Sequence, residues 1–289
     1  MGEDNDRLVQ ISLLALQRAF EVHETLGATG EQKVTKNAFG DTSLLIDIES
    51  EKAIIETFKD AKIPIRIISE EHGVVDIAEN PKYLGVLDGL DGTKEYLHAR
   101  GEGRYGALLG IFLGIDPYYS EYIFSGFMEH STHTLFYCQK DKGSFIQKEK
   151  KEEKISSSEQ KKLNEKIKIY VDFEFAKKKE GHFLHNLFVD TLKEHHFLRE
   201  VSLGVHLADV ASGVADIAVN ATRKKNLELA AMYGLFIEAG ACVLTITGES
   251  LGTKKYLEYG QKEQLGIICA ATKELGNELV EKIKKRQIS

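Results

Sequence analysis

The chain has 289 residues, of which 42% are hydrophobic and 29% are charged, a composition typical of a globular protein with one large domain or two closely packed ones. Its 38 basic and 45 acidic residues give a net charge of -7, which argues against a general binder of nucleic acid. An acidic protein with an anionic substrate needs a local source of positive charge, and a bound divalent metal is the simplest one.

The N-terminus and the cysteines bear on the compartment of the protein. The first residues, MGEDNDRLVQ, are acidic and show no basic region before an apolar stretch, so they do not resemble a secretory signal. No apolar run is long enough to span a bilayer. Cys138, Cys242 and Cys269 lie far apart in apolar contexts, which favours buried free thiols in a reducing compartment. We therefore expect a cytoplasmic protein without membrane or nucleic-acid partners.

Two helices and a polar connection are predicted at the start of the chain. Apolar residues at helical spacing predict a buried helix from Asp4 to about Leu26, where Gly27 ends it. The polar stretch 31–43 predicts a loop or mobile flap. A second helix is predicted for residues 44–60.

Short apolar runs then predict strands, and the first two end directly at acidic residues. Residues 63–69 end at Glu70 and Glu71, and residues 83–87 end at Asp88. Further strand patterns, arranged like a meander, occupy residues 105–115, 121–128, 132–138 and 143–147.

A change in composition divides the chain. Residues 148–168 are nearly all charged or polar, which predicts a solvated connection between two halves. The predicted halves are residues 1–150, an α+β region, and residues 151–289, an α/β region. In the second half, strand patterns at 167–173, 215–220, 241–247 and 265–270 alternate with helix patterns at 181–195, 205–213, 226–240 and from residue 272.

Three carboxylates at strand ends form a candidate metal site, namely Glu70, Asp88 and Asp91. Strand ends are the normal site location in α/β proteins, and Mg²⁺ prefers a few carboxylates together with water and substrate phosphate. Because Asp88 and Asp91 are three residues apart across a tight turn, both carboxylates and the carbonyl of Leu90 can face one point. Alternatively, the run DGLDGT is an ordinary turn with solvated acidic caps, and the motif alone does not decide between the two.

An anion site is predicted next to these carboxylates. Gly92 and Thr93 open a helix, and main-chain N–H groups at a helix N-terminus readily bind phosphate. Metal ligands and an anion site side by side are what phosphoryl transfer requires.

Several segments together resemble the inositol monophosphatase superfamily. SEEHG (69–73) followed by LDGLDGT (87–93) is similar to its first motifs, and NLELAAMYGLFIEAGA (226–241) is similar to a later block. GDTSLLIDIESEKAI (40–54) resembles the segment that carries a structural and catalytic aspartate, here Asp47. The motifs follow the order of the family over most of the chain.

The resemblance implies a fold and an activity. The fold would be α/β, a layered αβαβα sandwich, with the main metal-binding motifs in residues 1–150 and the active site between this half and residues 151–289. The activity would be a Mg²⁺-dependent phosphomonoesterase that hydrolyses inositol monophosphate, or a bisphosphorylated sugar or nucleotide, with two or three Mg²⁺ ions per site. Relatives are often dimers, so the resemblance also implies a homodimer.

The resemblance implies metal ligands. Glu70, Asp88 and the carbonyl of Leu90 would bind a first metal, while Asp88, Asp91 and Glu228 would bind a second. Two metals stabilise the attacking and leaving oxygens of an in-line displacement.

The resemblance also implies the remaining roles. The main-chain N–H groups of Gly92 and Thr93 would hold phosphate. The Thr93 hydroxyl, oriented by Asp47, would help Glu70 activate the attacking water, so these three residues would be catalytic.

Two positions depart from the family pattern inside the site. Gly89 replaces a proline, which predicts a looser turn because glycine frees the φ angle that proline restricts. Glu228 replaces an aspartate and is one methylene longer; the alternative reading of Glu228 is a surface carboxylate. Both departures keep open a rival hypothesis, in which the chain is a catalytically weakened relative that acts in binding or assembly.

Other departures concern the substrate pocket. Val201 and Ser202 match a Gly-Ser pair that lines the pocket of the family, so Ser202 is a candidate substrate-binding residue. Ala221 stands where inositol phosphatases often carry an acid. Arg223 begins a basic cluster that would suit a second phosphate on the substrate, although a solvated approach to the next helix explains the cluster equally well.

Overall fold

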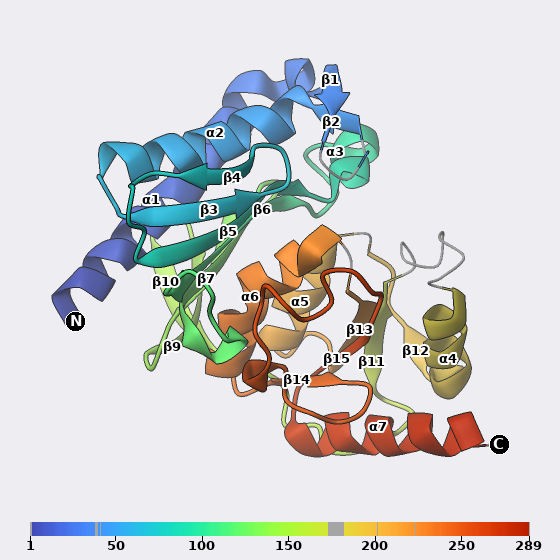
Figure 1. The fold of residues 1–289 in the computed structure, drawn as a ribbon. Helices are drawn as coiled ribbons and strands as arrows, with labels where there is room; N and C mark the ends of the chain where they lie inside the picture. Colours follow the sequence, from blue (N-terminus) through green and yellow to red (C-terminus); the bar gives the residue numbers. More distant parts are fainter. Residues whose placement is uncertain are drawn as a thin grey trace.

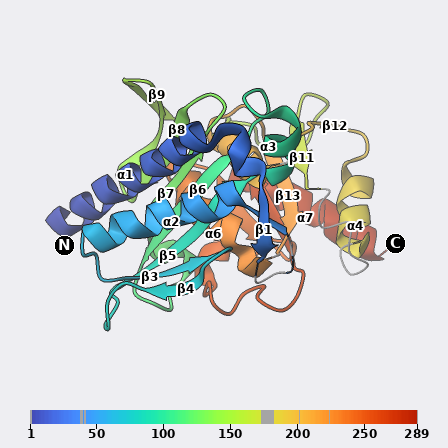
Figure 2. The same cartoon turned by 90° about the horizontal axis from the view of Figure 1, so that it is seen from above.

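Helices and sheets alternate in five layers (Figure 1). The computed structural model describes residues 2–37, 40, 42–172, 182–200, 202–222 and 224–288. The helices are α1 (Gly2–Leu26), α2 (Leu45–Asp60), α3 (Thr93–Ala99), α4 (His182–Leu192), α5 (Leu203–Ala211), α6 (Leu227–Glu238) and α7 (Lys273–Ile288). Helices α1 and α2 pack side by side on the outer face of the first sheet (Figure 2), α5 and α6 lie between the two sheets, and α4 and α7 cover the second sheet. The predicted αβαβα sandwich is confirmed.

The first sheet contains eight strands in the order β10-β9-β8-β7-β6-β5-β3-β4. Its strands are β3 (Ile65–Ser69), β4 (Gly73–Asp76), β5 (Tyr83–Asp91), β6 (Gly106–Leu113), β7 (Tyr122–Glu129), β8 (Thr134–Gln139), β9 (Gly143–Lys148) and β10 (Lys151–Ile155). Among the described strands of this sheet, only β3 and β5 pair in parallel, which brings the ends of both strands, and so Glu70 and Asp88, to the same edge.

The second sheet has five strands in the order β12-β11-β13-β15-β14. They are β11 (Lys168–Val171), β12 (His196–Phe197), β13 (Ile217–Ala221), β14 (Cys242–Thr245) and β15 (Gly266–Ala270). Strand β11 pairs in parallel with β12 and β13, and β15 pairs antiparallel with β13 and β14. Helical crossovers between the parallel strands match the expected α/β second half.

Each interface between layers has its own apolar core. Between α1, α2 and the first sheet, α1 buries one face through residues at helical spacing, among them Leu8, Ala15 and Ala19. The central core joins both sheets through α5 and α6, and the third lies beneath α4 and α7. Because the central core draws residues from both halves of the chain, burial of apolar surface holds the two sheets together.

Two polar segments that were predicted as loops contain strands. Within 31–43, strands β1 (Lys33–Lys36) and β2 (Thr42–Leu44) form an antiparallel hairpin, while Ala38, Phe39 and Asp41 lie outside the described residues. Residues 151–155 form edge strand β10, so the first sheet continues five residues past the predicted boundary at 150. Strands β1 and β10 are largely exposed on both faces, so they lack the alternation of apolar and polar residues that identifies a strand from sequence.

Two further observations concern the cysteines and the helices. Cys138, Cys242 and Cys269 are free thiols, and the first and last are buried. Within the described ranges, no helix carries an apolar stretch long enough to cross a membrane.

A buried histidine lies at the end of β7. His130 packs against the rings of Phe20, His23 and Tyr105, and in the part of the chain that the structure describes neither ring nitrogen of His130 has a hydrogen-bond partner. Burial, followed by the nearby His23 and His133, lowers the pKa of His130 well below 6.5.

This histidine should make the protein sensitive to acid. Below pH 6.5 the unfolded chain binds a proton that the folded imidazole cannot hold, so the contribution of His130 to stability is complete above pH 6.5 and falls as the pH drops. Between pH 7.5 and pH 5, wild type should lose up to about 2 kcal/mol more free energy of unfolding than His130→Gln. Urea denaturation at both pH values measures this difference, and His182→Gln, at an exposed histidine, is the control. Equal losses in wild type and His130→Gln would contradict the assignment.

Candidate active site

A bulge in β5 brings two acidic side chains to one side of the sheet. Opposite β6, Asp88 pairs with Leu108 and Asp91 with Gly106, so three steps along β5 match two steps along β6. In a regular strand, residues three apart point to opposite faces, and the extra residue reverses this. The main-chain N–H of Leu90 donates to Oδ1 of Asp88 at 2.9 Å, which fixes the turn between the two carboxylates.

The start of α5 holds Asp91 in place. Its Oδ2 accepts hydrogen bonds from the Ser202 hydroxyl at 2.6 Å and from the main-chain N–H of Gly204 at 2.5 Å. Ser202 also caps α5 by accepting from the N–H of Val205. Ser202 was predicted to contact substrate. In the structure its hydroxyl instead orients the Asp91 carboxylate.

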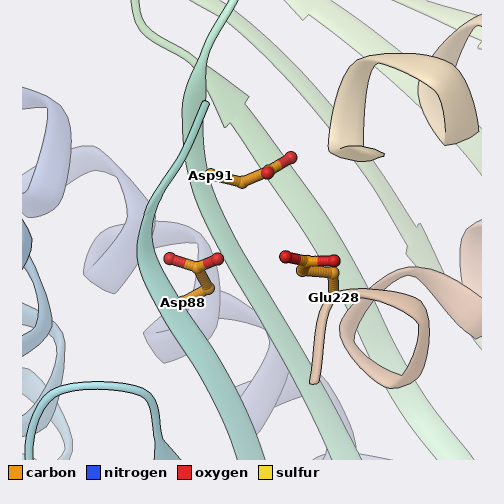
Figure 3. A group of neighbouring side chains, drawn as sticks. All are labelled: Asp88, Asp91 and Glu228. Atoms are coloured by element: carbon orange, nitrogen blue, oxygen red, sulfur yellow. The ribbon is translucent and has the colours of Figure 1, made fainter. Parts of the chain in front are cut away.

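Glu228 completes a group of three carboxylates. It lies in the first turn of α6, and each of Asp88, Asp91 and Glu228 offers an oxygen within 4.8 Å of the other two (Figure 3). All three residues are buried, which excludes the reading of Glu228 as a surface carboxylate. Burial, and then repulsion from Glu70, Asp91 and Glu228, raises the pKa of Asp88 well above its ordinary value. Convergent buried carboxylates that repel one another are the donor set that fits a hard divalent cation.

Glu70 lies next to this group but outside it. Its Oε1 accepts from the Lys224 ammonium at 2.6 Å and from the side-chain amide of Asn37, in the connection between β1 and β2, at 2.8 Å. Ser43, at the other side of the same hairpin, hydrogen-bonds the neighbouring Glu71. The segment predicted as a flap thus contacts both acidic residues that follow β3.

Glu51, which the sequence analysis missed, organises the loop that carries Glu70. This carboxylate on α2 is fully buried, and it accepts from the main-chain N–H groups of Glu70, Glu71 and His72 and from the His72 ring at 2.9 Å. The hydrogen bond to Glu51 raises the pKa of His72. A signal was available, since Glu51 shares a helix face with the apolar residues Ile54, Ile55 and Phe58, at spacings of three, four and seven.

Replacement of Glu51 by glutamine should loosen this loop. The amide removes the negative charge and one acceptor oxygen, so the variant should lose about 2 kcal/mol of unfolding free energy. It should also weaken Mg²⁺ binding about tenfold through misplacement of Glu70. Urea denaturation and calorimetric titration measure the two effects. Glu56→Gln, at an exposed position on the same helix, is the control and should match wild type.

Asp47 and Thr93 are not connected to each other in the way that was expected. Oδ2 of Asp47 accepts from the main-chain N–H of Leu44 at 2.7 Å, and the Thr93 hydroxyl donates to the carbonyl of Leu90 at 3.2 Å. Within the residues that the structure describes, no hydrogen bond joins the two side chains. Burial, and then repulsion from Glu71, Glu70 and Glu51, raises the pKa of Asp47 to about 8 despite the Leu44 hydrogen bond.

Two glycines in the DGLDGT turn are required by close packing. A Cβ atom at Gly89 would lie 2.5 Å from the main-chain oxygen of Asp47 and 2.7 Å from Cγ of Glu51. Gly89 therefore lets α2 approach β5 rather than only loosening the turn. Gly92 adopts a φ of 92° as the N-cap of α3, and a Cβ there would lie 2.8 Å from Cβ of Tyr105.

The basic cluster before α6 is described only in part. Arg223, the candidate for a second phosphate, lies outside the described residues. Its neighbour Lys224 pairs with Glu70 beside the acidic group, whereas Lys225 is exposed.

Comparisons with known proteins agree with this arrangement. A family model described as the inositol monophosphatase family matches residues 5–287. A search of curated proteins finds no match.

Solved structures share the fold over nearly the whole chain. An IMPase from Thermotoga maritima has a TM-score of 0.74 at 19% identity, covering 98% of this chain and 100% of that one. The extragenic suppressor protein suhB from Bartonella henselae has a TM-score of 0.74 at 18% identity, covering 96% and 99%. A gene product described as an inositol monophosphatase–fructose 1,6-bisphosphatase has a TM-score of 0.72 at 20% identity, covering 94% and 98%. At these identities the likeness shows a common fold.

Proposed function

The chain belongs to the inositol monophosphatase family and is a phosphoric monoester hydrolase, and from this premise we propose that it removes phosphate from a small phosphate ester with the help of Mg²⁺. One observation carries the proposal: the buried carboxylates of Asp88, Asp91 and Glu228 converge beside the Gly92 turn. Buried charges of one sign are costly unless a counter-ion is present, and a functional site is the usual reason to retain them.

We propose the following roles for the residues of the site. Asp88, Asp91 and Glu228 would hold one divalent ion, and Glu70 with Asp88 and the Leu90 carbonyl would hold another. When bound, such ions supply the positive charge that activates water and stabilises negative charge on the phosphate.

Other residues would position the reactants. The main-chain N–H groups of Gly92 and Thr93 would orient the phosphate oxygens. Glu70 would accept the proton of the attacking water, and Thr93 would orient that water once its hydroxyl turns away from the Leu90 carbonyl. Asp47 would act through the position of its helix, because its carboxylate is engaged with the Leu44 N–H.

The proposed substrates are small and polyanionic. Members of this family act on small phosphorylated molecules. The candidates are inositol monophosphate and a bisphosphorylated sugar or nucleotide. One structure with the same fold is described as an inositol monophosphatase–fructose 1,6-bisphosphatase. Arg223 would contact a second phosphate. Homodimer formation is also part of the proposal, and light scattering would check it.

A panel of phosphate esters tests the proposed function. Inositol 1-phosphate, fructose 1,6-bisphosphate and adenosine 3′,5′-bisphosphate are each incubated with the protein, with and without Mg²⁺. We expect Mg²⁺-dependent phosphate release from at least one of them.

A second candidate function is binding or assembly by a catalytically weakened relative. The ion pair between Lys224 and Glu70 favours it, because a protein cation already occupies a proposed metal ligand. Absence of turnover on every ester, together with absence of Mg²⁺ binding in calorimetry, would support this alternative and overturn the first.

A further inference from the structure

The Lys224 side chain lies beside the acidic group, paired with Glu70. The ammonium of Lys224 is 2.6 Å from Oε1 of Glu70, and the lysine side chain is only 25% exposed. Burial disfavours the charged form of Lys224, but attraction to Glu70, Glu228 and Asp88 outweighs burial and raises its pKa. Three carboxylates of the proposed metal site therefore share one protein cation.

An unusual turn aims this side chain. Lys224, Lys225 and Asn226 have φ values of 44°, 55° and 60°, a left-handed conformation that residues with a Cβ atom adopt only at a cost in free energy. The side-chain amide of Asn226 holds the turn by donating to the buried Tyr119 hydroxyl at 2.6 Å. Gln261 adds a hydrogen bond to the carbonyl of Lys225 at 3.2 Å. These two hydrogen bonds hold the strained turn, and the turn directs the Lys224 side chain towards Glu70.

We propose that the Lys224 ammonium competes with a divalent ion for Glu70, so that the ion at Glu70 binds only as Lys224 withdraws. This inference rests on the proposed function, because it concerns the same carboxylates. Asp88, Asp91 and Glu228 each offer an oxygen within 4.8 Å of the other two, whereas Glu70 lies outside this group. An ion at Glu70 must instead replace a short ion pair or tolerate a positive charge beside it.

The competition has two consequences. In the metal-free protein, Lys224 offsets part of the repulsion among four buried carboxylates, namely Glu70, Asp88, Asp91 and Glu228. In the metal-bound protein, the two ions should bind with separate affinities, and the weaker one should be the ion at Glu70. Removing the lysine charge should therefore destabilise the metal-free protein and strengthen the binding of the ion at Glu70.

Calorimetric titration with Mg²⁺ tests the proposal in wild type, Lys224→Met and Lys224→Gln. Wild type should bind one ion tightly and a second at least about tenfold more weakly, and both variants should tighten the weaker step by about tenfold or more. In EDTA, both variants should unfold at a lower temperature than wild type, and Mg²⁺ should raise their unfolding temperature by more. Lys225→Met is a matched control, because it removes the same charge one residue away, from an exposed side chain in the same turn.

The outcomes separate this inference from the proposed function. If wild type and both Lys224 variants bind Mg²⁺ with the same stoichiometry and affinities, the competition is refuted while metal dependence stands. If Lys225→Met reproduces the Lys224 effects, general charge rather than the Glu70 contact is responsible, and the competition is again refuted. If none of these proteins binds Mg²⁺, both the competition and the metal-dependent function are wrong. The circular dichroism spectrum of each variant checks that it is folded.

Discussion

Asp88→Asn should lower kcat/KM for the preferred phosphate ester by about 10³-fold or more, while it makes the metal-free protein more stable. Asp88 is the carboxylate that both proposed ion sites share, so a neutral amide weakens both at once. The stabilisation follows from repulsion: burial and three neighbouring carboxylates raise the pKa of Asp88, so its ionised form is costly at neutral pH. Asparagine retains an oxygen that can accept from the N–H of Leu90.

Phosphate release with Mg²⁺ and thermal unfolding in EDTA measure the two opposite effects. The control is Asp76→Asn, which removes an exposed carboxylate paired with Arg66 and should change neither quantity appreciably. If Asp88→Asn keeps wild-type turnover, the proposed role of Asp88 is refuted. If Asp88→Asn is less stable than wild type in EDTA, Asp88 has a structural role and the repulsion between it and the neighbouring carboxylates is small.

Gly89→Pro restores the residue that is typical of the family, and it should nevertheless damage this protein. A Cβ at position 89 would overlap the main-chain oxygen of Asp47 at 2.5 Å and Cγ of Glu51 at 2.7 Å. To accept it, α2 must move away from β5, and Glu51 would carry the Glu70 loop with it. We expect a loss of about 2–4 kcal/mol in unfolding free energy, and an activity loss of about 10²-fold from misplacement of the site.

Alanine variants separate steric overlap from the special effects of proline. Gly89→Ala should lose at least about 2 kcal/mol. Gly85→Ala is the matched control on the same strand. Its Cβ would lie nearest to side-chain carbon atoms of Ile65 and Ile67, at 3.1 and 3.2 Å, which can give way, and the main-chain oxygen of Arg66 is at an ordinary contact distance of 3.7 Å. Urea denaturation compares the two. If Gly89→Pro instead raises the unfolding temperature, the sequence-based reading of a merely loosened turn is correct.

The long regular elements could be predicted from sequence because their signals are local. The helix predicted from Asp4 to about Leu26 is observed as α1 (Gly2–Leu26), and that predicted for 44–60 is observed as α2 (Leu45–Asp60). Helical periodicity, with Gly27 after the first helix, suffices for this. Strand β10 could not be predicted, because its exposed, charged residues become a strand only by pairing with β9.

The sequence by itself determined the alternation of strands and helices and the acidic residues at strand ends, because these patterns lie in the chain itself, and the order of its motifs implied the layered fold through the family resemblance. Only the tertiary structure decided what those residues contact: Glu51 is 19 residues from Glu70, Ser202 is 111 from Asp91, and Lys224 is 154 from Glu70. Such contacts depend on the β5 bulge, the close approach of α2 at Gly89 and the left-handed turn before α6. Packing geometry sets all three, and no local pattern of residue types encodes distances between segments that meet only after folding.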